Sequence, residues 1–171
     1  MKLNKFLVAA ASLTFAAGAF ANSGSGSIPF KGSIIEAPCS IDTEATEKEV
    51  DLGQVSDVLL AAGGKSHSKP FDIVLKDCSI ATKTKVKATL SGLPSAINPD
   101  LLGMSGQAQG ASIAIEDASG ALVVLGQASK PQTLVVGDNT IHYNAYLQGD
   151  SSVAVTPGNF TANVTYGLSY E

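Results

Sequence analysis

Apolar and polar residues alternate with period two along several stretches of the chain, the pattern of β-strands that bury one face. The longest alternation covers residues 160–170 and places on one face Phe160, Ala162, Val164, Tyr166, Leu168 and Tyr170. Shorter alternations occupy residues 71–75, 86–90, 112–116 and 139–147. We expect a strand in each of these stretches.

Turn residues separate these stretches, and helical signals are weak. Residues 117–120 read Asp-Ala-Ser-Gly, which predicts a turn that returns into a second strand at 122–125 and so forms a hairpin. Residues 55–62 end before a Gly-Gly pair and predict a turn or a short helix. Many short strands of this kind predict an all-β fold, an immunoglobulin-like antiparallel sandwich, with a closed barrel as the alternative.

The N-terminus carries the features of a secretory signal peptide. Lys2 and Lys5 begin a basic region, residues 6–20 are apolar, and small residues flank Phe20 at a cleavage site after Ala21. The alternative, a membrane anchor, is disfavoured because the apolar run is too short to span about 30 Å of hydrocarbon. We therefore expect residues 1–21 to be removed on export.

Export places the two cysteines, Cys39 and Cys78, in an oxidising compartment, where they are expected to pair with each other. A free thiol or a bond between two chains is the alternative. In the chain-entropy model, closing this loop stabilises the fold by roughly 4 kcal/mol.

Composition and charge exclude several functions. The chain has eleven lysines, no arginine and a net charge of −4 at pH 7, whereas nucleic-acid binders present a basic, arginine-bearing surface. His67 lies in a polar loop and His142 on the polar face of a strand, and two histidines are too few for a histidine-rich metal centre. The acidic residues between Asp42 and Asp51 lack a calcium-loop pattern. We expect no metal, no cofactor and no enzyme.

Residues 22–34 stand apart from the rest of the pattern. They begin with a Gly/Ser-rich stretch that is typical of flexible linkers. The alternation then resumes, and one face carries Ile28, Phe30, Gly32 and Ile34. The segment is either the first strand of the chain's own sandwich or a strand that completes the sheet of another molecule. Pro29 cannot donate a backbone hydrogen bond, which favours an edge or an incompletely paired strand.

Several motifs follow one another along the mature chain. They occupy residues 28–35, 37–41, 50–55, 71–78, 113–126 and 139–141. Near the C-terminus, Gly158 lies fourteen residues from the end and Tyr170 is penultimate, with the long alternation between them. In this combination the chain resembles the chaperone-usher pilins, specifically the type 1 fimbrial major subunit family, whose C-terminal signature is such a glycine and a penultimate aromatic residue.

The resemblance implies an immunoglobulin-like sandwich that lacks its seventh strand and keeps an apolar groove beside its last strand. In that family a periplasmic chaperone fills the groove first. At the outer-membrane usher, the N-terminal strand of the next subunit then replaces the chaperone strand. Applied to this chain, the resemblance implies a signal peptide (1–21), a donor-strand extension (22–34) and an incomplete pilin domain (35–171).

The same resemblance assigns roles to individual residues. The donor residues are Ile28, Phe30, Gly32 and Ile34. The acceptor residues are Gly158, Phe160, Val164, Tyr166, Leu168 and Tyr170. Cys39 and Cys78 match the family disulfide, and the Glu171 carboxylate matches the terminus that the chaperone anchors with basic residues.

The predicted function is therefore a structural subunit of a bacterial surface fimbria. Such a subunit polymerises with copies of itself, supports cell adhesion and is located outside the cell. The alternative is a minor adaptor or tip subunit with a direct, lectin-like receptor-binding role. Neither nucleic-acid binding nor membrane insertion after signal cleavage is expected.

Overall fold

A computed structural model gives the fold and describes residues 26–32, 34, 37–46 and 49–171. The chain divides into two units, residues 1–34 and residues 35–171. In the first unit, residues 26–32 and 34 adopt neither helix nor strand. The predicted signal peptide lies outside the described residues. All the described strands and helices belong to the second unit.

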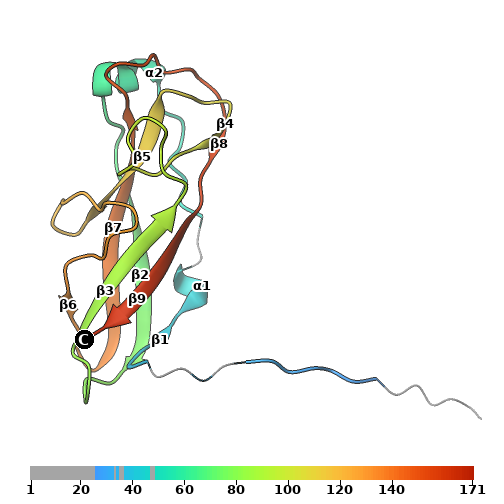
Figure 1. The fold of residues 1–171 in the computed structure, drawn as a ribbon, viewed down its shortest axis with the longest axis vertical. Helices are drawn as coiled ribbons and strands as arrows, with labels where there is room; N and C mark the ends of the chain where they lie inside the picture. The colour runs from blue at the N-terminus through green and yellow to red at the C-terminus, as the bar shows by residue number, and fades with distance from the viewer. Residues whose placement is uncertain (1–25, 33, 35–36, 47–48) are drawn as a thin grey trace, which may run out of the picture. The chain divides into compact units, whose positions relative to one another are not determined.

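The second unit is built from two antiparallel sheets. The larger sheet contains β1 (Ser40–Ile41), β2 (Lys69–Cys78), β5 (Ala111–Asp117) and β7 (Gly137–Gly149), in the order β1-β2-β7-β5. The smaller sheet contains β3 (Lys85–Gly92), β6 (Gln132–Thr133) and β9 (Val164–Tyr170), in the order β6-β3-β9. A short separate pairing joins β4 (Ser105–Gly106) to β8 (Phe160–Thr161). The two sheets pack face to face as a sandwich (Figure 1). The predicted fold class is therefore confirmed, and the sheets do not close into the alternative barrel.

Helical structure is short, as the sequence predicts. The helices are α1 (Thr43–Thr46), α2 (Asp57–Leu60) and the 3-10 turn η1 (Ala61–Gly63). The expected turn or short helix over residues 55–62 is therefore present. It ends where Ala62 and Gly63 adopt positive φ angles of 52° and 82°.

Period-two alternation determines which side chains form the core. On β3, the inward residues Val86, Ala88 and Leu90 are at most 1% exposed. The predicted inward face of β7 is buried too, and it carries Ile141, Tyr143, Ala145 and Leu147. Ile73 and Leu75 of β2 complete the layer between the sheets. The predicted strand faces are thus confirmed, and apolar burial of this kind is the main stabilising contribution to the fold.

A bulge in β2 brings the second cysteine into the core. Leu75 pairs with Asn139 and Cys78 pairs with Gly137, so β2 advances three residues while β7 advances two. In a regular strand an odd spacing would place Leu75 and Cys78 on opposite faces. The extra residue, accompanied by a positive φ of 52° at Asp77, returns Cys78 to the buried side. Cys78 forms a disulfide with Cys39, so the predicted pairing within the chain is confirmed.

The predicted hairpin after residue 112 is only partly present. β5 ends in the expected turn, where the Asp117 carboxylate accepts hydrogen bonds from the backbone nitrogens of Ser119 and Ala121. The predicted return strand at 122–125 is wrong. These residues make one isolated bridge, between Glu116 and Leu122, and form no strand. The backbone instead turns away towards β3, where the Gly126 nitrogen donates to the Leu90 carbonyl oxygen at 2.8 Å.

The predicted continuous strand over residues 160–170 is also interrupted. Residues 160–161 (β8) pair with β4, whereas residues 164–170 (β9) pair with β3, and residues 162–163 belong to neither ladder. The partner changes where the ladder with β3 ends, at Gly92 opposite Val164. A Cβ on Gly92 would lie only 2.8 Å from the Asn163 carbonyl oxygen. Side-chain alternation nevertheless continues across the break.

Candidate functional site: a groove along an unpaired strand edge

A groove of about 1110 Å³ opens along one side of the sandwich. Its first wall is formed by residues 155–164 and Tyr166, which include β8 and the start of β9. Its second wall is formed by residues 49–57. Its floor consists of core side chains from both sheets, including Ile73, Leu90, Ile113, Ile115, Ala145 and Leu147. These floor side chains are themselves buried, at most 6% exposed, so the groove runs over the core between two chain segments.

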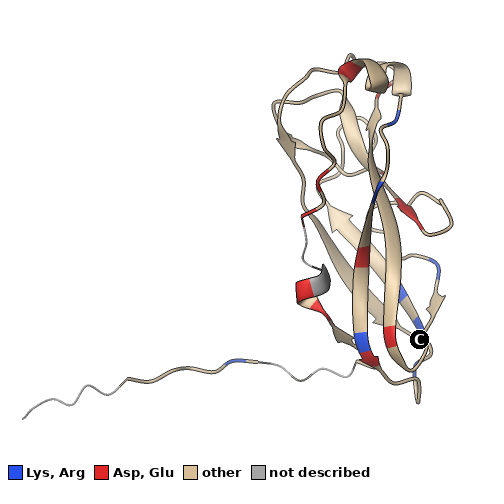
Figure 2. Cartoon of the chain, turned by 180° about the vertical axis from the view of Figure 1, so that it is seen from behind, with Lys and Arg blue, Asp and Glu red and all other residues tan. Residues whose placement is uncertain are grey.

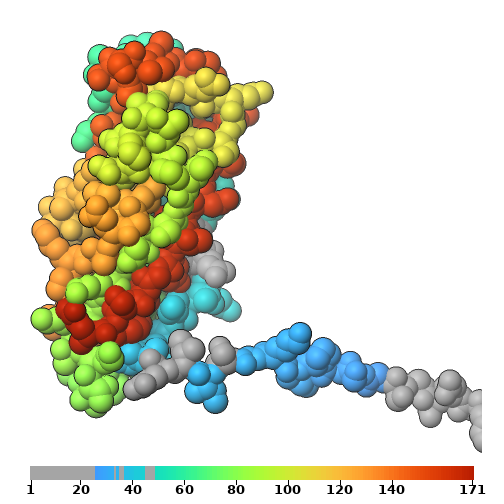
Figure 3. All heavy atoms as spheres, in the orientation of Figure 1, coloured from blue at the N-terminus to red at the C-terminus, as the bar shows by residue number. Residues whose placement is uncertain are grey.

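The first wall is an incomplete sheet edge. β9 lies at the end of the order β6-β3-β9, and among the described strands none pairs with its outer side. Its inward side chains are only half-buried: Val164, Tyr166, Leu168 and Tyr170. The inward residues of the neighbouring β3 are fully buried. In the space-filling view the C-terminal residues run along the surface beside β3 (Figure 3). Such an edge combines unpaired backbone groups with uncovered apolar side chains.

The second wall was not predicted from the sequence as part of the site. Val50, Leu52 and Val55 are half-buried, and Leu52 and Val55 pack against the core. Glu49 and Asp51 are exposed. The alternation of Val50 and Leu52 with these two acids was a detectable signal, although a short one. The wall contains no strand, and the backbone turns within it at Gly53, whose φ is 73°.

Glycines allow two segments to pass closely at the end of the first wall. A Cβ built on Gly158 would lie 2.7 Å from both the backbone nitrogen of Ala108 and the carbonyl carbon of Gln107. The Gln107 nitrogen donates a hydrogen bond to the Asn159 carbonyl oxygen at 2.9 Å. Gly158, which the family resemblance singled out, therefore lines the groove at a point where no side chain fits.

Replacing Gly158 by alanine is expected to destabilise the subunit by about 1–3 kcal/mol, because the added methyl group must displace backbone rather than a flexible side chain. The matched control is Gly167→Ala on the outward face of β9, where nothing lies within 4 Å of an added Cβ. That substitution is expected to be neutral or slightly stabilising. Urea unfolding of the purified subunits measures both effects. Equal midpoints for the two variants would contradict the steric role of Gly158.

The far end of β9 lies outside the groove. Of the predicted acceptor residues, Gly158, Phe160, Val164 and Tyr166 line the groove, whereas Leu168, Tyr170 and Glu171 do not. Leu168 and Tyr170 instead continue the same half-buried face against the core. Burial raises the pKa of the Tyr170 phenol.

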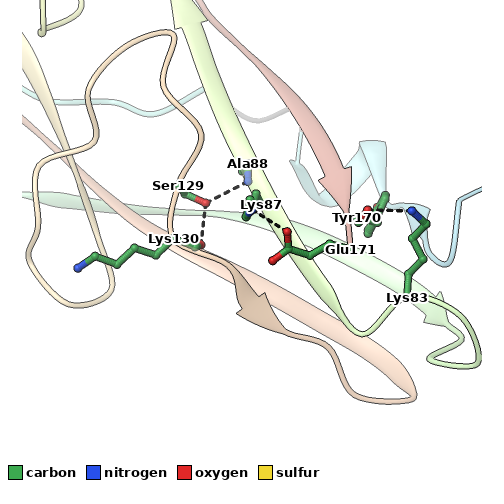
Figure 4. A network of polar contacts seen from close by, with 7 residues as sticks. All are labelled: Lys83, Lys87, Ala88, Ser129, Lys130, Tyr170 and Glu171. Atoms are coloured by element: carbon green, nitrogen blue, oxygen red, sulfur yellow. Dashed lines mark hydrogen bonds and ion pairs between the residues drawn. The ribbon is translucent and has the colours of Figure 1, made fainter.

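Lysines of the β2–β3 connection and β3 surround the last residues (Figure 4). The Lys83 ammonium donates to the Tyr170 carbonyl oxygen at 3.0 Å, and the Lys87 ammonium lies 2.7 Å from the Glu171 carboxylate. The hydrogen bond from Lys87 lowers the pKa of the Glu171 side chain. The backbone of Glu171 also pairs with that of Lys85. The end of β9 is thus held on its β3 side, and the groove adjoins the other end of the strand, near β8.

The predicted donor residues belong to the first unit and are uncovered. Ile28, Phe30 and Ile34 are 79%, 91% and 104% exposed. Gly32 has no atom within 4 Å of an added Cβ. Large apolar side chains in water are unfavourable by roughly 1.5–3 kcal/mol each relative to burial. The segment therefore presents a row of apolar groups without a core of its own.

Both histidines of the chain lie at the surface of the second unit. His67 is exposed, and His142 is exposed with its Nδ1 atom 2.7 Å from the Asp72 carboxylate directly across the strand pair. Within the same residues, no group of three or more His, Cys, Asp or Glu side chains could hold a metal ion. No helix in the described part of the chain is long and apolar enough to cross a membrane.

Comparison with known proteins gives the family. A family model described as "Fimbrial protein" matches residues 28–171. The chain belongs to the fimbrial protein family. It is 48% identical over 175 residues to the Fimbria A protein of Serratia marcescens, with the full length of both chains covered. It is 41% identical to the Major MR/P fimbria protein of Proteus mirabilis, again over the full length of both.

Solved structures of fimbrial proteins share the fold. The crystal structure of the P pilus rod subunit PapA matches with a TM-score of 0.71 and 35% identity, covering 79% of this chain and all of that one. A chain of a chaperone-usher pilus matches with a TM-score of 0.73 and 32% identity, covering 87% of this chain and 97% of that one. The fold is accordingly the immunoglobulin-like sandwich of the pilins.

Membership of this family establishes the broad function. The protein is a structural subunit of a bacterial surface fimbria, and its location is extracellular, on the cell surface. The similar proteins that match most of the chain include a major fimbrial protein and a rod subunit, which favours a shaft subunit over the tip adaptor. The family is a structural one rather than a family of enzymes.

Proposed function

We propose that this fimbrial protein polymerises head to tail, with residues 28–34 of one copy lying in the groove of the next. In this proposal residues 1–21 are the signal peptide, 22–34 the donor extension and 35–171 the acceptor domain. The half-buried inward face of β9, next to a groove that opens onto the core, carries the proposal.

The chemistry of the donor segment matches the groove. In an extended strand, alternate residues face the same side and lie about 7 Å apart. Ile28, Phe30 and Ile34 then face the groove floor together, and Gly32 leaves one position without a side chain. Each buried apolar side chain contributes roughly 1.5–3 kcal/mol before ordering costs. The inserted strand also pairs with the backbone of the open edge, apart from the hydrogen bond that Pro29 cannot donate.

The proposed contact generates a fibre without further components. Donor and acceptor are different surfaces of the same chain, so the contact is head to tail and forms an open polymer when it does not close into a ring. Every copy carries both surfaces, and each link therefore leaves one free donor and one free groove at the ends. This property suits a shaft subunit that repeats many times.

An open apolar groove requires cover before polymerisation, since exposed edges of this kind associate without specificity. We propose that a periplasmic pilus chaperone supplies that cover and that an outer-membrane usher exchanges it for the donor segment of the next copy. Subunits with this role need no catalytic activity, and we propose none for this chain.

Replacing Phe30 by aspartate tests donor insertion. Loss of the phenyl group from the groove and introduction of a charge there are expected to reduce assembled fimbriae at least about a hundredfold. The matched control is Ser27→Asp, which adds the same charge on the opposite face of the segment. Surface extracts run unboiled on a denaturing gel should give a ladder for the control that collapses on heating in acid. An equal ladder from the Phe30 variant would disprove donor insertion.

A further inference from the structure

The charged side chains around the groove all have one sign. Among the described residues that line it, Glu49, Asp51, Asp57 and Asp72 are acidic and none is a lysine or histidine. The chain as a whole is acidic, with a net charge of −4, and its charged residues are few and scattered (Figure 2). In residues 22–34 the only charged side chain is that of Lys31, and it is exposed.

Two of these acidic groups, Glu49 and Asp51, lie on the outward side of the second wall. Val50 and Leu52 are half-buried towards the core, and Glu49 and Asp51 alternate with them and are exposed. The corresponding outward residues of the first wall are uncharged and exposed: Thr161, Asn163 and Thr165. A strand lying in the groove therefore has an acidic neighbour on one side and a neutral polar neighbour on the other.

The other two carboxylates are less suited to pairing with an incoming strand. Asp72 already contacts His142 at 2.7 Å. The Asp57 carboxylate, at the start of α2, accepts two hydrogen bonds, from the Val58 nitrogen at 2.9 Å and from the Ser56 hydroxyl at 3.4 Å. The Asp51 carboxylate accepts one bond from the Gly53 nitrogen at 2.8 Å, which leaves it further acceptor sites. Glu49 and Asp51 are therefore the groups of the second wall that remain for a cation.

We infer that Lys31 of one copy pairs with Glu49 or Asp51 of the next copy and so selects the register of the inserted strand, an inference that rests on the proposed donor insertion. With Phe30 facing the floor, Lys31 faces outward, on the same side as the two acids. Side chains directly across neighbouring strands have Cβ atoms about 5 Å apart, and diagonal neighbours about 7 Å, distances that a lysine spans.

Lys31 discriminates against a register shift by one residue and against a shift by two residues in one direction. A shift by one residue reverses the faces and turns the Lys31 ammonium towards apolar floor residues such as Ile73 and Ile113, where a charge has no partner. A shift by two residues keeps the faces and moves Lys31 about 7 Å along the wall. In one direction this takes Lys31 beyond both acids, and in the other it takes Lys31 from one acid to the next. The apolar donor side chains alone strongly oppose a shift by one residue, and they oppose a shift by two residues more weakly.

Charge reversal tests this inference in intact fimbriae. When Lys31→Glu is co-expressed with the unaltered chain, its share in the fimbriae, relative to its share in the cell, is expected to fall about three- to tenfold, as for loss of an exposed ion pair plus a new repulsion. The combination Lys31→Glu with Glu49→Lys and Asp51→Lys should restore assembly of that chain with itself. The control is Lys130→Glu, an exposed lysine that does not line the groove. Mass spectrometry of the altered peptides gives the shares.

Cross-linking tests the contact directly. A carbodiimide, which joins an ammonium to a carboxylate without a spacer, should link the peptide containing Lys31 to the one containing Glu49 or Asp51, and only between copies. Normal incorporation of Lys31→Glu together with absence of this cross-link overturns the inference. If that result is obtained but Phe30→Asp abolishes the fimbriae, only the role of Lys31 is wrong and donor insertion is retained. If Phe30→Asp assembles normally, the proposed function itself is wrong.

Discussion

A subunit lacking residues 22–34 is expected to form no fimbriae alone and to occupy at most one position, at one end, of any fibre that it enters. The groove belongs to the retained residues 49–166, so the shortened chain still accepts a donor segment. It has no segment to donate, and every link of a head-to-tail polymer needs one donor and one groove. The change removes the linking contact but not the sandwich.

Co-expression of the shortened, epitope-tagged chain with the unaltered chain provides the measurement. Unboiled gels should show hybrid oligomers with a single tagged copy, and immunogold labelling should mark one fibre end. The control is an equally tagged full-length chain, which should label the whole shaft. Labelling along the shaft by the shortened chain would show that residues 22–34 are not the link.

Under the proposed donor insertion, the open edge accounts for self-assembly. A sandwich with all its edges covered would gain little from a second copy. Here the inward side chains of β9 are half-buried, whereas those of the neighbouring β3 are fully buried. In the proposed assembly, covering the β9 side chains makes association with a second copy favourable. The first unit has three exposed apolar side chains, and these lack a core in which to be buried. In the proposed assembly, the groove of one copy buries the apolar side chains of another, and the inserted segment covers the open edge.

Local pattern was sufficient to predict the strand faces. Alternation alone identifies Val86, Ala88 and Leu90 as core, because side-chain direction in a strand depends only on position along it. The disulfide was also predictable, since export and two cysteines leave one simple pairing within the chain. The short helix near residue 57 follows from its closing glycines.

Features that depend on distant partners were not predictable. The break after Thr161 arises because β3 ends at Gly92, and the sequence of residues 160–170 carries no sign of that. The bulge at Asp77 depends on the register with β7, and the return at 122–125 is lost to a contact with β3. The second wall of the groove was missed for a similar reason. Residues 49–57 become a wall only when another segment faces them. The donor and acceptor roles stay predictions.

Replacing both cysteines by serine is expected to lower the free energy of unfolding by about 2–5 kcal/mol, a large share of what a small domain possesses. The disulfide joins residues 39 apart in sequence, so its loss frees a long loop in the unfolded chain. The inward side chains of β9 are only half-buried, so this edge contributes less apolar burial to stability than β3 does. Urea unfolding of the purified subunit measures the effect, and Ser40→Ala, next to Cys39 and exposed, is the control.

The disulfide also acts on the site. It ties the start of β1 to the end of β2, where the Ser79 nitrogen donates to the Pro38 carbonyl oxygen at 2.7 Å and Ser40 pairs with Lys76. The chain leaves this anchor through α1 and then forms the second wall, residues 49–57. Serine variants that fold should therefore hold that wall less firmly and bind the donor segment more weakly. A double-serine variant with an unchanged unfolding midpoint and a normal ladder would show that β1 stays in place without the covalent bond.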